Sequence, residues 1–212
     1  MSIENKEEVA ISVRSVSGNA DRLREEVRTL VMKALVDNQA NPAAMRDIMR
    51  DTLAGVGSGL LARGQQAGGA LREAVRGMDE AVGRSVFALR MALEEARGMG
   101  HQLADSEVSD TVDSVRGLEE DLLSTIREAS DKAEGWLKGE YADLRQHLAR
   151  TGTDTGAQVR AVMEKLNNRM SGIAAGTVSE TLATARDAKG RLAAVASGIL
   201  RGLADGIDAR HK

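Results

Sequence analysis

The chain has 212 residues and a net charge of −3, from 29 lysines and arginines against 32 aspartates and glutamates. It contains no cysteine, which excludes a disulfide scaffold, a thiolate metal site and a cysteine nucleophile. The nearly balanced charge disfavours a dedicated nucleic-acid-binding protein, because such proteins typically carry a large basic excess. We therefore expect no nucleic-acid partner.

The composition predicts an all-α fold. Aromatic side chains are the large fillers of ordinary cores and bury about 150–250 Å² each, but this chain has only three. Its core must therefore consist of Ala, Val, Leu, Ile and Met. No sustained period-two pattern follows residue 20, and the single proline permits long helices.

The first 18 residues form a polar lead-in. Alternation at Val9, Ile11, Val13 and Val16 could indicate a short strand. A lone strand would have no partner, so we expect a flexible or loosely docked arm over 1–18. The start is acidic and does not match a secretory signal. The sequence has no stretch of 18 or more apolar residues, so no membrane-spanning helix is predicted.

A shorter helix is predicted from about Asn19 to Asp37, since its apolar residues recur three and four apart. The pair Asn41-Pro42 then starts a long helix, with asparagine as cap and proline at the first helical position. Its apolar pattern continues to Leu103. Six glycines interrupt it, each costing about 1 kcal/mol relative to alanine. We expect a hinge or break among them, at Gly55, Gly57, Gly59, Gly64, Gly68 and Gly69.

Two further long helices are predicted, one carrying apolar residues from Val112 to Leu148 and one from Val159 to Ile207. A loop at Thr151–Gly156 separates them. Together the elements predict an elongated antiparallel bundle of about three long helices plus one shorter N-terminal helix. The bundle forms a single domain over 19–208, and 209–212 form a frayed tail.

A stripe of small residues lies on the last helix, one turn apart. It allows another backbone to approach closely. The surface that meets it belongs either to the chain's own bundle or to another helix, subunit or membrane, and both interpretations stay open. The stripe consists of Gly190, Ala194, Gly198, Gly202 and Gly206.

No catalytic residue, cofactor site or metal site is predicted. Asp143 and His147 share a helix face, but a metal site needs three or four converging ligands. The acidic clusters at 79–80, 94–95 and 119–121 are interpreted as solvated helix faces. The loop Thr151–Gly156 lacks the Gly-Lys-Ser/Thr ending of a phosphate loop, so we predict a capping turn in which Thr153 or Thr155 accepts amide hydrogen bonds. The protein is expected not to be an enzyme.

Four segments resemble an uncharacterised family of proteobacterial proteins of about this length. They are RTGTDTG at 150–156, REAVRGMDEAVGRS at 72–85, LEEDLLSTIREASDKA at 118–133 and ASGILRGLADGI at 196–207. The resemblance covers most of 20–208 and implies a cytoplasmic bacterial helical protein, without assigning any site residue. The chain is also similar in style to phasins, helical proteins that coat polyhydroxyalkanoate granules, because it is Ala-rich, Cys-free, amphipathic and poor in aromatics.

These features predict a non-enzymatic interaction or scaffold protein that self-associates and coats a hydrophobic granule or lipid surface in a phasin-like way. Helix faces made of Ala, Gly and Val bury little apolar area. Because burial contributes about 25 cal/mol per Å², such faces stabilise the fold weakly alone, and a second subunit or surface adds stability. One alternative is a membrane-active protein that inserts through Ala54–Ala70 or Leu192–Ile207. Another is a small-ligand carrier in the bundle core.

Overall fold

The computed structural model describes residues 7, 11, 20–38, 41–64, 69–98, 113, 115–170, 195–199 and 201–202. This part of the chain is helical and contains no strand, so the predicted all-α class is confirmed. Within it, no helix is long and apolar enough to cross a membrane. The longer helices of the described part are α2 (Ala20–Asp37), α3 (Pro42–Arg63), α4 (Ala70–Gly98), α6 (Leu118–Lys132), α7 (Gly135–Thr151) and α8 (Asp154–Met170).

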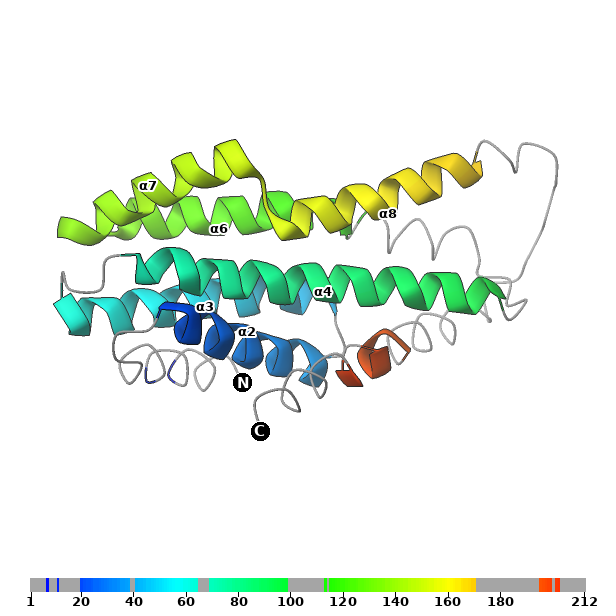
Figure 1. The fold of residues 1–212 in the computed structure, drawn as a ribbon, viewed down its shortest axis with the longest axis horizontal. Helices are drawn as coiled ribbons and strands as arrows, with labels where there is room; N and C mark the ends of the chain where they lie inside the picture. Colours follow the sequence, from blue (N-terminus) through cyan, green and yellow to red (C-terminus); the bar gives the residue numbers. More distant parts are fainter. Residues whose placement is uncertain are drawn as a thin grey trace.

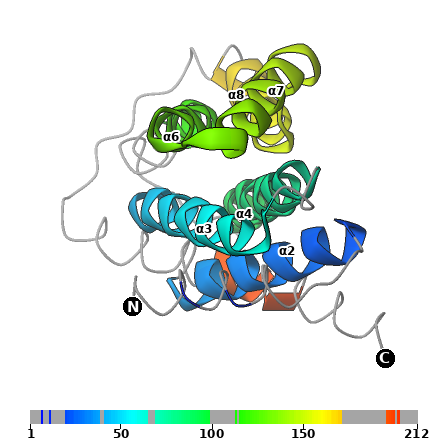
Figure 2. The same ribbon diagram turned by 90° about the vertical axis from the view of Figure 1, so that its left-hand side faces the viewer.

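The helices lie in three tiers (Figures 1 and 2). The inner tier is α3 and α4, the outer tier is α6, α7 and α8, and α2 lies on the opposite side together with the helical residues between 195 and 202. The chain reverses direction from α2 to α3 and again from α3 to α4. In contrast, α7 and α8 follow each other in the same direction, and α8 runs alongside α4 in parallel.

The helix boundaries in the first half follow the local chemistry. Asn38 ends α2, and its side-chain amide donates to the carbonyl of Ala34 at 2.7 Å. Pro42 is the first residue of α3 and follows Asn41, as the cap-and-proline pattern predicts. Helix α3 continues to Arg63, and the chain then takes a positive φ of 72° at Gly64.

The second half contains a division that the sequence did not predict. The pattern expected to form one helix up to Leu148 is interrupted at Ala133, whose backbone is extended, and Gly135 has a φ of 57°. This break separates α6 from α7. A second glycine with positive φ, Gly152 at 75°, ends α7 just before α8 begins.

The core is aliphatic, as the composition predicted. It is built from Leu, Val, Ala, Ile and Met side chains, and Tyr141 is its single aromatic member in the described part. Helix α4 lies at the centre, because α2, α3, α7 and α8 all pack against it. Of the predicted N-terminal arm, only Glu7 and Ile11 are described, and both are exposed. The predicted tail at 209–212 lies outside the described residues.

Candidate functional site

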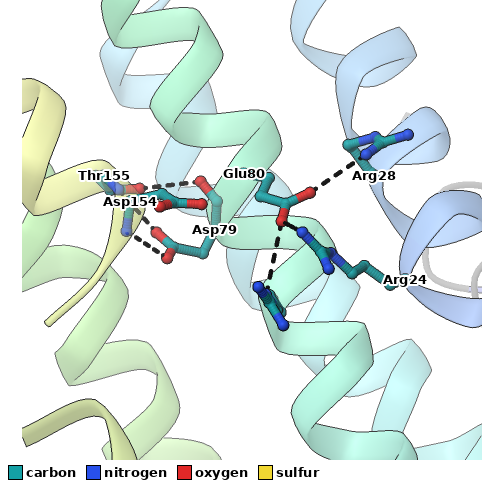
Figure 3. A network of polar contacts seen from close by, with 7 residues as sticks. Arg24, Arg28, Asp79, Glu80, Asp154 and Thr155 are labelled. Carbon is teal, nitrogen blue, oxygen red and sulfur yellow. Dashed lines mark hydrogen bonds and ion pairs between the residues drawn. The ribbon is translucent and has the colours of Figure 1, made fainter. Parts of the chain in front are cut away.

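The middle of α4 carries two adjacent acids, Asp79 and Glu80, that point to opposite neighbours (Figure 3). The sequence interpretation placed them on a solvated face, and that interpretation is wrong. Asp79 is only 6% exposed, and the Glu80 side chain is 10% exposed. The packing of α8 and α2 against α4 covers these two positions, while Arg72 and Arg76 of the same helix stay exposed.

Glu80 holds α4 against α2. Its carboxylate accepts hydrogen bonds from Arg24 and, at 3.3 Å, from the Nη1 atom of Arg28. Arg76, one turn earlier on α4, lies 3.7 Å from the same carboxylate. The hydrogen bond to Glu80 raises the pKa of the Arg24 guanidinium above its ordinary value. One buried acid is therefore shared by three arginines, which compensates the cost of its burial.

Asp79 holds α4 against the first turn of α8. Its Oδ2 accepts the backbone N–H of Asp154 at 2.7 Å, and its Oδ1 accepts the backbone N–H of Thr155 at 2.9 Å. The Thr155 hydroxyl donates to the carbonyl of Asp79 at 3.3 Å. These two amides belong to the helix end that lacks intrahelical acceptors. Burial raises the pKa of Asp79, because it disfavours the charged form more than the amide bonds favour it.

The turn before α8 is a helix cap. The Thr153 hydroxyl accepts the backbone N–H of Gly156 at 2.9 Å, so the predicted capping turn is confirmed. The same hydroxyl donates to Glu119 of α6 at 3.0 Å, and Arg160 lies 3.6 Å from the other oxygen of Glu119. Glu119, expected to be solvated, thus connects α6 to the cap. We call the contacts of Asp79, Thr153 and Glu119 around the start of α8 the polar clasp.

Two glycines of α4 allow its neighbours to approach closely. A Cβ atom at Gly77 would lie 3.1 Å from backbone atoms of Arg24 and Arg28 in α2, and closer still to the Arg24 carbonyl oxygen. A Cβ at Gly83 would lie 3.3 Å from the backbone of Asp154. The sequence interpretation missed both, because it searched for glycines four apart, whereas these are six apart and face different helices.

The predicted hinge glycines lie on both sides of the connection between α3 and α4. Gly55 and Gly59 are buried inside α3, and Gly57 is half-buried with its Cβ position 4.0 Å from the Tyr141 hydroxyl. Gly64 and Gly69 have φ of 72° and 78°, with no neighbouring atom within 4 Å of their Cβ positions. Gly68 lies outside the described residues.

The predicted small-residue stripe is described only in part. Gly198 and Gly202 are exposed, and no atom lies within 4 Å of their Cβ positions. Their neighbours Ala196 and Ser197 are buried instead, and the Ser197 hydroxyl donates to the carbonyl of Val36 in α2 at 3.4 Å. Gly190, Ala194 and Gly206 lie outside the described residues.

A cavity of about 480 Å³ lies beside the polar clasp, where α7 ends and α8 begins above α4. Val75, Leu144 and Leu148 contribute apolar walls, and Arg72 and Arg160 are among its cationic residues. A second hollow of about 360 Å³ lies on the Glu80 side of α4. We call the first of these the α4–α7–α8 cavity.

The chemistry of this region is that of helix attachment. Both oxygens of Asp79 accept amide protons, and Glu80 is shared by arginines, so neither acid has an oxygen free of a partner. Among the described residues, no group of three or more His, Asp or Glu side chains could hold a metal ion. The contacts fix α4 relative to α2 on one side and to α8 on the other.

Comparison with known proteins identifies a family for the chain but no activity. No curated protein and no solved structure matches it. A family model described as "Family of unknown function (DUF6781)" matches residues 2–209. The resemblance to an uncharacterised family is therefore confirmed, and it extends over almost the whole sequence. The chain belongs to this family of unknown function (DUF6781).

Proposed function

We propose that this protein is a non-enzymatic helical interaction protein that self-associates and covers a hydrophobic granule or lipid surface in the cytoplasm. In this proposal an elongated helical bundle opens between its inner and outer tiers and turns its aliphatic faces toward the surface, in a phasin-like way. One observation carries the proposal. The outer tier covers an aliphatic face of α4, while its direct polar attachment to α4 is concentrated at the start of α8.

The composition of the covered faces supports opening. Met49 and Met78 are fully buried in a core built mainly of aliphatic residues. Methionine is unbranched and flexible, so it adapts to irregular apolar surroundings. Such faces gain the same burial energy, about 25 cal/mol per Å², against an external apolar surface as against each other.

The polar clasp adds little resistance to opening. A hydrogen bond exchanged for bonds to water contributes only about 0.5–1.5 kcal/mol net. When the tiers separate, the amides of Asp154 and Thr155 and the carboxylate of Asp79 all become hydrated. The main cost of opening is then the exposed apolar area, and an external apolar surface removes that cost.

A reversible crosslink between the tiers tests the proposal. Arg46 of α3 and Asp121 of α6 form an exposed ion pair at 2.6 Å that joins the two tiers. Exposed pairs contribute about 0–1 kcal/mol, so the double variant Arg46→Cys, Asp121→Cys should fold normally. The natural chain has no cysteine, so a bismaleimide with a cleavable disulfide spacer would join only these positions.

Binding to triolein droplets by flotation is the measurement. We expect the uncrosslinked variant to float with the droplets, the crosslinked variant to stay in the aqueous phase, and cleavage of the spacer to restore flotation. Equal flotation of the crosslinked protein would refute opening between the tiers. Absence of flotation in all forms would refute surface covering.

Two further measurements test the remaining parts. Light scattering should give a mass that is a multiple of the 22.5 kDa chain, and a monomer at all concentrations would refute self-association. Release of a dye trapped in liposomes would favour the alternative, insertion into the membrane, over surface covering.

A further inference from the structure

We propose that the α4–α7–α8 cavity binds a small anionic amphiphile, a molecule with a carboxylate head on a short hydrocarbon chain. The inference is independent of the proposed surface covering, because it depends on the lining of one cavity and not on opening of the tiers. The volume of the cavity, about 480 Å³, falls within the range of about 300–1,000 Å³ that is typical of small-molecule sites.

The inner walls of the cavity suit a hydrocarbon chain. Val75 of α4 and Leu144 of α7 are both 2% exposed, and Leu148 of α7 is partly buried against the core. All three line the cavity. A hydrocarbon chain placed against them loses contact with water, at a gain of about 0.8 kcal/mol per buried CH₂ group.

The entrance suits an anionic head. Arg72 and Arg76 come from α4, Arg160 comes from α8, and all three are exposed. Within the described part of the chain, Arg72 has no ion-pair partner, and the pairs of Arg76 and Arg160 with glutamates are long, at 3.7 and 3.6 Å. Guanidinium groups bind carboxylates in bidentate geometry. Arg72 has no such pair to break among the described residues when it turns toward a ligand, and the largely exposed pair of Arg160 contributes only about 0–1 kcal/mol. Arg76 keeps its contact with Glu80 and adds positive charge nearby.

The acids that line the cavity do not cancel this charge. Asp79 and Asp154 are its acidic lining residues. Both oxygens of Asp79 already accept amides of α8, and Asp154 is a single exposed carboxylate in a lining that contains three arginines. Apolar walls below a cationic entrance therefore favour an amphiphile over an inorganic anion, which would leave the walls uncovered.

Calorimetric titration of the whole protein with octanoate tests the inference. We expect saturable binding of octanoate, much weaker binding of acetate, and no binding of octyltrimethylammonium, which has the same chain and the opposite charge. The double variant Arg72→Gln, Arg160→Gln should weaken octanoate binding by about tenfold or more, equivalent to about 1.4 kcal/mol. Both side chains are exposed, so circular dichroism should show an unchanged fold.

Two controls make the result specific to the cavity. Arg50→Gln removes an exposed charge on α3 that pairs with Asp47 of the same helix at 2.9 Å and does not line the cavity, so it should leave octanoate binding unchanged. Leu148→Ala shortens one wall and should weaken octanoate more than acetate. The inference is overturned if the double variant binds octanoate like the wild type, or if Arg50→Gln weakens binding equally. Binding only to anionic vesicles, with none to monomeric octanoate, also overturns it.

Discussion

The close approach of α2 to α4 predicts that the smallest possible enlargement of Gly77 destabilises the protein. A methyl group at this position would meet backbone atoms of Arg24 and Arg28, not the movable end of a side chain. The contact therefore cannot be relieved by a change of rotamer. Helix α2 must move away from α4 until the Arg24 oxygen clears the 3.0 Å below which Cβ contacts essentially never occur.

The size of the effect follows from two opposing contributions. Overpacking of a well-packed contact costs about 1–3 kcal/mol, occasionally more, and a gap of about 0.5–1 Å elsewhere along the interface forfeits a quarter to a half of the dispersion attraction there. Alanine in place of a helical glycine returns about 1 kcal/mol of helix propensity. Because α2 and α4 share the largest helix–helix interface of the described part, overpacking and lost dispersion should dominate. After the propensity gain is subtracted, the net loss should be about 1–2 kcal/mol.

Thermal unfolding of matched glycine variants measures this effect. Gly139 of α7 is helical and exposed, with no atom within 4 Å of its Cβ position, so Gly139→Ala receives the propensity gain alone. For a chain of this size, 1 kcal/mol corresponds to about 2–4 °C. We expect Gly77→Ala to lower the Tm by about 2–8 °C and Gly139→Ala to raise it by about 2–4 °C. A Gly77→Ala protein at least as stable as the wild type would refute the close approach.

Four further predictions concern the polar clasp and the single tyrosine. Asp79→Ala should cost about 1–3 kcal/mol, because it leaves buried amides of α8 without an acceptor. Since burial raises the pKa of Asp79 above its ordinary 3.8, its contribution is fully present below about pH 3.8 and decreases as the pH rises through the folded-state pKa. The stability of the wild type relative to Asp79→Asn, measured by urea unfolding, should therefore be largest in acid, and the opposite trend would contradict it. Thr153→Ala should cost about 0.5–2 kcal/mol in the same assay and Thr153→Ser much less, because serine keeps the capping hydroxyl. Burial raises the pKa of Tyr141 to about 12, so absorbance at 295 nm should titrate near pH 12 in the folded protein and near pH 10 in denaturant. A folded-state midpoint near 10 would show that this side chain is not buried.

The parts of the fold that depend on short-range chemistry were predictable from the sequence. Asn41-Pro42 marks the start of α3 because capping and proline geometry act within one turn. Thr153 caps α8 for the same reason. The aliphatic core follows from composition alone, since three aromatics cannot fill it.

The parts that depend on distant partners were not predictable in the same way. Asp79 was assigned to solvent because the sequence pattern placed it opposite the apolar stripe of its helix, and only the packing of α8 on α4 gives it amides to bind. The residues around Gly77 and Gly83 do not show that glycine is required there. The requirement comes from the backbones of α2 and α8, which lie against these positions only in the folded protein.

The central position of α4 has a consequence for synthesis of the protein. Its contacts with α2 and α3 involve segments already made, whereas Asp154, which Asp79 binds, follows 75 residues later. At about 5–20 residues per second, this part of the chain takes about 4–15 s to emerge from the ribosome. During that interval one side of α4 awaits its cover, so the nascent protein presents an aliphatic face to chaperones, or to an apolar surface nearby, before the mature molecule encloses it.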